Sequence, residues 1–236
     1  MKEWAPVGAL LIGSYVAGSV PFGLWVTKAW SGVDIRGVGS GNIGTTNVMR
    51  AAGLRAAIVV FLLDASKGGA PVLAARALVA HGGYGGASVA IVLGAGAATL
   101  LGHAFSIFLK LRGGRGAATG VAVMAALCWQ TGLSGFGVFV VVVVVTRMIS
   151  AGSIVGSASM PLFMAVYGQS AEYIVFAAAA AALVIARHAP NIGRMLRGEE
   201  AKVGRRAREA PPGAITSDTA PPDAAPASQA EGSPDG

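Results

Sequence analysis

Long apolar runs separated by short polar loops occupy most of the chain. About seven such runs can be placed, at residues 5–25, 54–75, 87–109, 117–129, 135–149, 154–167 and 173–186. A helix of about 20 residues crosses the ~30 Å hydrocarbon core of a bilayer, so we expect the shorter fourth and sixth runs to be tilted or to extend beyond these limits. Residues 139–145 are nearly all valine, but a lone strand in lipid leaves its backbone unpaired, so a helix is favoured here too. The pattern predicts an all-α integral membrane protein with about seven transmembrane helices.

The composition supports a membrane protein and excludes several kinds of site. Hydrophobic residues make up 54% of the chain and charged residues 12%, against about 25% charged residues in soluble domains. The acidic residues before Gly198 are Glu3, Asp34, Asp64 and Glu172. The histidines and the single cysteine are far apart in sequence and lack zinc-ligand spacing. We therefore expect no catalytic carboxylate pair, no metal and no cofactor.

The basic residues fall mostly in the loops on one side of the predicted membrane. Fifteen of the 18 lysines and arginines lie there, including all those from Arg187 onward, whereas Lys2 and Arg76 fall on the other side and Lys67 lies within a run. Cytoplasmic loops carry an excess of Lys and Arg. The distribution predicts an N-terminus outside and a C-terminus in the cytoplasm. It also explains the net charge of +7 without a nucleic-acid partner.

The two ends of the chain differ from the rest. Lys2 before the first apolar run resembles a signal peptide, but six further runs favour a retained helix, kinked near its end by Pro21. Residues 206–236 are rich in Pro, Ala, Gly and Ser and cannot bury enough apolar surface to fold. We expect a membrane domain over residues 1–205 and a disordered cytoplasmic tail over residues 206–236. The basic cluster at residues 202–208 either favours anionic lipid head groups or only fixes the orientation.

A glycine-rich polar loop, VGSGNIGTTNV at residues 38–48, follows the first run. Glycines let such a loop fold tightly and turn several N–H groups toward one point, which suits an anion such as phosphate. The arginine two residues further on adds a fixed charge and a fork of donors. The alternative is a membrane turn with a basic flank, but the hydroxyl and amide groups exceed what a turn needs. The candidate ligands are Ser40, Gly41, Asn42, Gly44, Thr45, Thr46, Asn47 and Arg50.

Two further motifs place charged residues next to glycines. Asp64 and Lys67, three residues apart in the second run, share a helix face and can pair, either as part of a site or as a structural ion pair. The loop KLRGGRGAAT at residues 110–119 precedes a new helix, whose N-terminal N–H groups attract anions. An ordinary basic loop would not need these glycines. The candidate ligands in the two motifs are Lys67, Arg112, Gly113, Gly114, Arg115 and Gly116.

The last run ends in RHAPNIGR at residues 187–194. His188 and Asn191 are three residues apart and can project together, although Pro190 prevents an undisturbed helix. A lone histidine at a membrane interface is usually passive, but beside Asn191 and several arginines His188 is a candidate donor or base. His103 either helps to shape the site or is a buried histidine bonded to a helix carbonyl, and the structural role is slightly favoured.

These motifs, in this order, resemble those of the bacterial acyl-phosphate:glycerol-3-phosphate acyltransferases of the PlsY type. The matching segments are GSGNIGTTNVMRAAG, DASKG, GHAFSIFLKLRGGRGAATG and RHAPNIGRMLRGEE, within residues 7–205. The resemblance implies a multi-pass enzyme of the bacterial plasma membrane with its active site facing the cytoplasm. It would transfer a fatty acyl group from acyl phosphate to the sn-1 hydroxyl of glycerol 3-phosphate, giving lysophosphatidate and phosphate in phospholipid synthesis. Membrane lipids and a functional link to the enzyme that makes acyl phosphate are implied as well.

The resemblance also implies roles for single residues. The residues that match the family's glycerol-phosphate site are Ser40, Arg50, His188 and Asn191. Ser40, His188 and Asn191 become the catalytic candidates, and Lys67 matches the lysine of the second motif. Arg115 stands where the family usually has lysine, and Arg112 likewise replaces a frequent lysine. Arginine keeps the charge but is bulkier and planar.

The chemistry expected from the residues fits this resemblance. Acyl phosphate is already an activated mixed anhydride, so alignment matters more than a strong protein nucleophile. We hypothesise direct attack by the substrate hydroxyl without an acyl-enzyme, with either the donor's own phosphate or His188 accepting the proton. The main alternative is a membrane transporter for a phosphorylated metabolite or other anion. Such a protein needs a polar path to the opposite face, where the loops at residues 80–86 and 131–135 offer little polar chemistry.

Overall fold

The computed structural model describes residues 4–203, and every regular element in that range is a helix. The predicted tail at residues 206–236 lies outside the described residues. The α-helices are α1 (Ala5–Ser19), α2 (Phe22–Ser31), α3 (Thr45–Gly82), α4 (Ser88–Ala104), α5 (Ala117–Leu127), α6 (Trp129–Thr146), α7 (Ile149–Val166), α8 (Ala171–Arg187) and α9 (Ala189–Leu196). Three short 3₁₀ helices, η1 (Ile35–Gly37), η2 (Gly85–Ala87) and η3 (Ile107–Leu109), lie in the connections.

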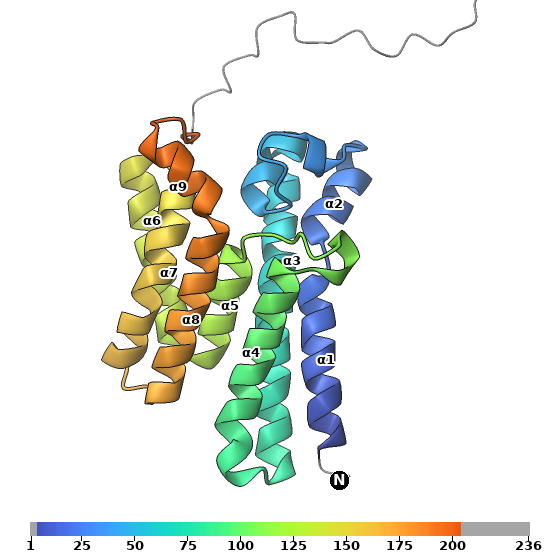
Figure 1. Ribbon diagram of the computed structural model, residues 1–236, viewed down its shortest axis with the longest axis vertical. Coiled ribbons are helices and arrows are strands. Elements are labelled where there is room, and N and C mark those ends of the chain that lie inside the picture. The colour runs from blue at the N-terminus through green and yellow to red at the C-terminus, as the bar shows by residue number, and fades with distance from the viewer. Residues whose placement is uncertain (1–3, 204–236) are drawn as a thin grey trace, which may run out of the picture. The chain divides into compact units, whose positions relative to one another are not determined.

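The long helices of the described part lie roughly alongside one another (Figure 1). Helix α1 packs against α4, and α3 packs against both α4 and α5. Helix α7 packs against α6 and α8, and α5 contacts helices of both groups. Helix α5 therefore joins α1, α3 and α4 to α6, α7 and α8.

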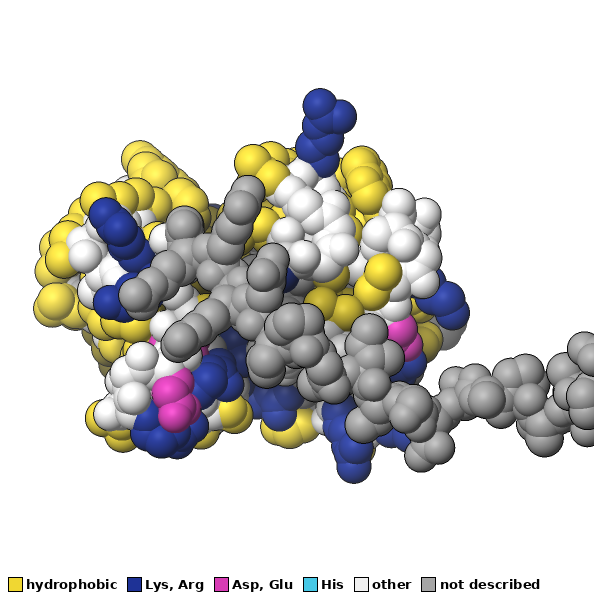
Figure 2. Space-filling model, turned by 90° about the horizontal axis from the view of Figure 1, so that it is seen from above, with side chains coloured by type: hydrophobic (Ala, Val, Ile, Leu, Met, Phe, Trp, Pro, Cys, Tyr) yellow, Lys and Arg dark blue, Asp and Glu magenta, His cyan; other side chains and the backbone are white. Residues whose placement is uncertain are grey.

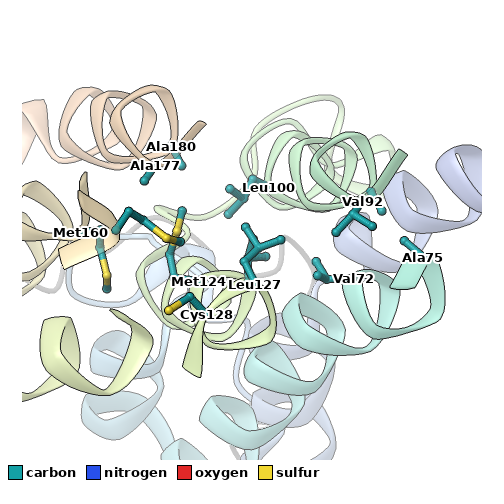
Figure 3. Close-up of a cluster of buried hydrophobic side chains, with 13 residues drawn as sticks. Val72, Ala75, Val92, Leu100, Met124, Leu127, Cys128, Met160, Ala177 and Ala180 are labelled. Carbon is teal, nitrogen blue, oxygen red and sulfur yellow. The ribbon is translucent and has the colours of Figure 1, made fainter. Parts of the chain in front are cut away.

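A buried hydrophobic cluster surrounds α5, which contributes Met124 and Leu127, and Cys128 directly after the helix belongs to it as well (Figure 3). Lipid tails are as apolar as leucine, so helix association in a membrane depends on close packing rather than on leaving water. Small residues allow that packing where α1 meets α4. A Cβ atom added to Gly18 would lie 2.2 Å from the Thr99 carbonyl oxygen, and one added to Gly102 would lie 2.2 Å from that of Tyr15.

The number of membrane spans follows the sequence prediction only in part. By length and composition, four helical segments of residues 4–203 can cross a membrane: Ala5–Ser31, Gly85–Leu109, Trp129–Thr146 and Ile149–Val166. Helices α8 and α9, bent by 59° relative to each other, make a fifth if the pair is one span. The all-helical class is confirmed, whereas about seven spans and their orientation stay predictions.

Several helix ends differ from the predicted limits of the runs, and two of these differences lie beside the polar motifs. The loop predicted for residues 38–48 ends at Gly44, because the extended Gly44 starts α3 and leaves Thr45 in its first turn. The run predicted through residue 109 ends as α-helix at Ala104, because Phe105 leaves helical geometry with φ −126° and ψ 63°. The expected kink at Pro21 is confirmed as a full break between α1 and α2.

Candidate functional site

The polar motifs gather at one end of the helices. This end carries α2, the start of α3, the connection from α4 to α5, and α9 (Figure 1). Seen from that side, Lys and Arg side chains greatly outnumber the acidic ones (Figure 2). In the described part of the chain, basic residues therefore dominate the end of the helices that carries these segments.

The first polar loop is organised around the side chain of Asn47, which is 2% exposed. Its Nδ2 donates to the carbonyl oxygens of Ile35, Val38 and Asn42 at 3.3, 2.8 and 2.9 Å. Its Oδ1 accepts from the Ser40 N–H at 3.2 Å. These bonds leave Asn47 to hold the loop in shape rather than to face a ligand. Ser40 itself is exposed, as is the Arg50 side chain on the first turns of α3.

Replacing Asn47 with alanine should therefore destabilise the protein more than replacing the nearby Asn42 with alanine. Four hydrogen bonds to largely buried groups are lost, so we expect the free energy of unfolding to fall by about 2–4 kcal/mol. Asn42→Ala removes the bond from the Gly44 N–H to Oδ1 and should cost about 1 kcal/mol. Thermal unfolding of both variants in detergent measures the difference, and equal losses would contradict this role for Asn47.

The glycine loop before α5 is packed directly on the end of α4. The Gly113 and Gly114 N–H groups donate to the carbonyl oxygens of Ala104 and His103 at 3.1 and 3.0 Å. A Cβ atom on Gly113 would lie only 2.0 Å from the His103 oxygen, so the close approach requires glycine. Because these two N–H groups are already bonded, Gly113 and Gly114 support the loop. Gly116, with φ +81°, starts α5.

Arg187 at the end of α8 holds the same loop from the other side. Its Nη2 donates to the Gly113 oxygen at 2.7 Å and its Nε donates to the Gly114 oxygen at 3.2 Å. The guanidinium also lies 5.6 Å from the centre of the Phe105 ring. The two carbonyl groups thereby gain partners, and the loop is fixed between α4 and α8. Sequence reasoning noted Arg187 only as one of several basic residues.

Arg115 is the centre of a cationic cluster. Burial of its guanidinium lowers the pKa of Arg115 to about 10, and the charges of Arg194, Arg50 and Arg187 act in the same direction. The charge of Glu200 opposes them. These residues come from α3, the glycine loop, α8 and α9, and from the segment that follows α9. A bound phosphate would relieve the mutual repulsion of the arginines and bond to their N–H groups.

His188 lies at the break between α8 and α9 and is 3% exposed. Its Nδ1 is 2.7 Å from the Val184 carbonyl oxygen. A carbonyl can only accept, so Nδ1 carries the proton and Nε2 of the neutral ring is an acceptor. Among the described residues Nε2 has no hydrogen-bond partner. This is the state that a general base requires.

Asn191 follows in the first turn of α9 and is held by Glu200. Its Nδ2 donates to Glu200 Oε1 at 2.7 Å, and the same oxygen accepts from Ser150 Oγ at 2.7 Å. Arg194 Nε donates to Oε2 at 2.7 Å. Burial alone would raise the pKa of Glu200, but the hydrogen bonds from Asn191, Ser150 and Arg194 outweigh it and lower that pKa.

Orienting the Asn191 amide in this way leaves its oxygen free. Oδ1 is buried and has no hydrogen-bond partner within residues 4–203. Such acceptors are rare in proteins because an unmade bond costs free energy, which points to a donor from a ligand or a water. Glu200 and Ser150 were missed from the sequence. Glu200 ends the matching segment RHAPNIGRMLRGEE without being named there as a site residue, and no local pattern links Ser150 to it.

Asp64 and Lys67 form the predicted ion pair inside α3. Lys67 Nζ lies 2.8 Å from Asp64 Oδ1, and both side chains are 4% exposed. The ammonium also donates to the Val20 carbonyl oxygen at 2.7 Å and lies 5.5 Å from the centre of the Phe22 ring. Val20 is the residue that directly follows α1. Lys67 thus connects the α1–α2 break to α3, and the contacts of its ammonium named above are all with groups of the protein.

Together these features define a helical protein with apolar candidate membrane spans, a cluster of arginines and a buried histidine beside it. The described residues contain no group of His, Cys, Asp and Glu that would hold a metal ion. The model of the glycerol-3-phosphate acyltransferase family matches residues 8–198, and the chain belongs to that family.

Individual relatives agree with this assignment. The chain is 39% identical to the glycerol-3-phosphate acyltransferase of Desulforamulus reducens over 84% of its own length and 95% of the relative's. It is 42% identical to the glycerol-3-phosphate acyltransferase of Rubrobacter xylanophilus, over 84% of its own length and 95% of the relative's. The crystal structure of PlsY, an integral membrane glycerol 3-phosphate acyltransferase in its glycerol 3-phosphate form, superposes with a TM-score of 0.77. That structure is 36% identical, over 85% of this chain and 96% of PlsY.

Proposed function

We propose that this protein transfers a fatty acyl group from acyl phosphate to the sn-1 hydroxyl of glycerol 3-phosphate, giving lysophosphatidate and phosphate. The observation that carries the proposal is the presence of two free acceptor atoms, His188 Nε2 and Asn191 Oδ1, beside the cationic cluster around Arg115. A substrate with both a hydroxyl group and a phosphate matches these features. PlsY, a relative of similar fold, has been crystallised in glycerol 3-phosphate and lysophosphatidic acid forms.

The proposed site divides into groups that meet substrate and groups that hold them. The exposed part of the first loop, with Arg50, and the cluster around Arg115 would bind the phosphates. The support is supplied by Gly44, Asn47, Lys67, Gly113 and Gly114, whose side-chain or N–H bonds are made within the protein. The proposed ligands are Ser40, Gly41, Asn42, Thr45, Thr46, Arg50, Arg112, Arg115, Gly116, His188 and Asn191.

In the proposed reaction the sn-1 oxygen attacks the acyl carbon directly. The new ester C–O bond forms, and the bond from the acyl carbon to the phosphate oxygen breaks. Asn191 Oδ1 accepts a hydrogen bond from a glycerol hydroxyl and orients it, while His188 Nε2 takes the proton that the attacking hydroxyl loses. The arginines stabilise the charge on the leaving phosphate, as preorganised donors do in other transfer reactions.

The proposed location is the bacterial plasma membrane, with the site on its cytoplasmic side. The support is the gathering of basic residues at the end that holds the site, because cytoplasmic loops are rich in Lys and Arg (Figure 2). Both proposed substrates bear phosphate, so the same positive end attracts them. A functional link to the enzyme that supplies acyl phosphate follows from this donor.

The donor is tested with purified protein in lipid and labelled glycerol 3-phosphate. Palmitoyl phosphate, palmitoyl-CoA and palmitoyl-carrier protein are supplied in separate reactions. We expect labelled lysophosphatidate from palmitoyl phosphate alone. Product from palmitoyl-CoA or palmitoyl-carrier protein instead would support the acyltransferase activity but contradict acyl phosphate as the donor. Folded protein that gives no product with any donor would contradict the proposed function and favour transport of a phosphorylated metabolite.

A further inference from the structure

A buried chain of hydrogen bonds runs from the ion pair of α3 to the glycine loop. Thr119 Oγ1, in the first turn of α5, lies 3.1 Å from the Asp64 carbonyl oxygen and 3.2 Å from His103 Nδ1. Thr119 is fully buried and His103 is 4% exposed. The chain therefore joins α3, α5 and α4 at the level of the loop that packs on His103.

The order of donors along this chain follows from the groups present. The Asp64 oxygen only accepts, so the single hydroxyl proton of Thr119 points to it. The Thr119 oxygen is then the acceptor for His103, whose Nδ1 must carry the proton. The other edge of the ring faces the loop: a Cβ atom on Gly114 would lie 2.3 Å from His103 Nε2. The ring is thus held by Thr119 at its Nδ1 edge, and the glycine loop packs against its Nε2 edge.

The backbone of His103 bonds to the same loop, through its carbonyl oxygen and the Gly114 N–H at 3.0 Å. A shift of His103 would accordingly carry Gly114 and the adjoining Arg115 with it. Arg187 fixes the opposite side of the loop at the Gly113 and Gly114 oxygens. The position of the loop, and of the N-terminal end of α5, is therefore set by His103 from one side and Arg187 from the other.

We propose that His103 and Thr119 are positioning residues that set the glycine loop at the distance needed to bind a substrate phosphate. This inference rests on the proposed acyltransferase function and gives the Asp64–Lys67 motif a place in it. The ion pair fixes the part of α3 that carries the Asp64 carbonyl. Neither His103 nor Thr119 needs to touch substrate, so their loss weakens phosphate binding without removing a reacting group.

Thr119→Val and Thr119→Ser form the first test. Valine keeps the shape but removes the hydroxyl that joins Asp64 to His103, whereas serine keeps it. We expect Thr119→Val to raise the KM for at least one of the two phosphate substrates about tenfold, with kcat reduced less than threefold. Thr119→Ser should stay within about twofold of wild type in both constants. A purely structural role would lower the folded fraction, and hence the apparent kcat, and leave KM unchanged.

His103→Asn and His103→Gln form the second test. The shorter asparagine places its amide N–H near the position of Nδ1, so it can still donate to Thr119, while glutamine is closer to histidine in size but extends past that position. We expect a lower KM for His103→Asn than for His103→Gln. If the protein needs only bulk at this position, the order is reversed.

The outcomes separate this inference from the proposed function. Wild-type protein without acyltransferase activity overturns the proposed function and removes the basis of the inference. Active wild-type protein with equal KM values for Thr119→Val and Thr119→Ser overturns the inference alone. If Thr119→Val does not fold, the order of the two His103 variants decides it.

Discussion

Replacing His188 with alanine lowers the rate of acyl transfer by about 10²–10⁴-fold, the usual contribution of a positioned general base. The expectation follows from the bond between Nδ1 and the Val184 oxygen, which leaves Nε2 as an acceptor in the neutral ring. The effect should appear in kcat more than in KM, because proton transfer matters in the transition state. Product formation from palmitoyl phosphate and labelled glycerol 3-phosphate measures it.

His81 provides a matched control for this substitution. Its Nδ1 lies 2.8 Å from the carbonyl oxygen of Ala77, four residues earlier, in the same kind of contact. It is exposed near the end of α3, away from the glycine loop and α9 (Figure 1). His81→Ala should therefore retain activity. Full turnover by His188→Ala would remove the base role and leave the donor's own phosphate as the proton acceptor.

Replacing Lys67 with methionine should give the largest loss of stability. The change leaves the Asp64 carboxylate buried without its partner and removes the bond to the Val20 oxygen. Breaking a buried ion pair at one partner typically costs about 3–5 kcal/mol. The double variant Asp64→Asn with Lys67→Met should recover part of the loss, because no unpaired charge is left. Unfolding of both variants in detergent measures the two free energies.

The exposed pair of Arg197 and Glu199 is the control for the buried one. Its Nε and Oε2 atoms are 2.7 Å apart, close to the 2.8 Å of the buried pair, but the side chains are 60% and 56% exposed. Arg197→Met should change the free energy of unfolding by less than about 1 kcal/mol, since exposed pairs are screened by solvent. Equal effects of Lys67→Met and Arg197→Met would contradict the tie between α3 and the α1–α2 break.

The sequence is sufficient to predict the helical membrane class and one buried ion pair, because both follow from local patterns. Apolar runs identify the helices, and the ion pair of Asp64 and Lys67 follows from helical spacing alone. The ends of the helices are less accessible to such reasoning. The first turn of α3 depends on the extended Gly44 and its bond to Asn42, and the end of α4 depends on Phe105 leaving helical geometry.

Which residues face a ligand and which only support the loops depends on contacts between segments that are distant in sequence. The loop motifs predict Asn47, Gly113 and Gly114 as ligands. Their hydrogen bonds to residues of neighbouring segments instead indicate that they hold the loops in shape. Ser150 and Glu200 meet across 50 positions of the chain, and a single sequence gives no signal for that pairing. The Oδ1 atom of Asn191 is free only because Glu200 fixes the amide.

The most direct test of the account compares variants from separate motifs in one assay of lysophosphatidate formation from palmitoyl phosphate. Ser40→Ala comes from the first loop, Arg115→Ala from the glycine loop and Asn191→Leu from α9, with Arg197→Met as the control. The account predicts an active wild-type protein and control, and at least a tenfold loss in kcat/KM for each of the other variants. Wild-type activity in any of those three folded variants would contradict a single site built from all the motifs.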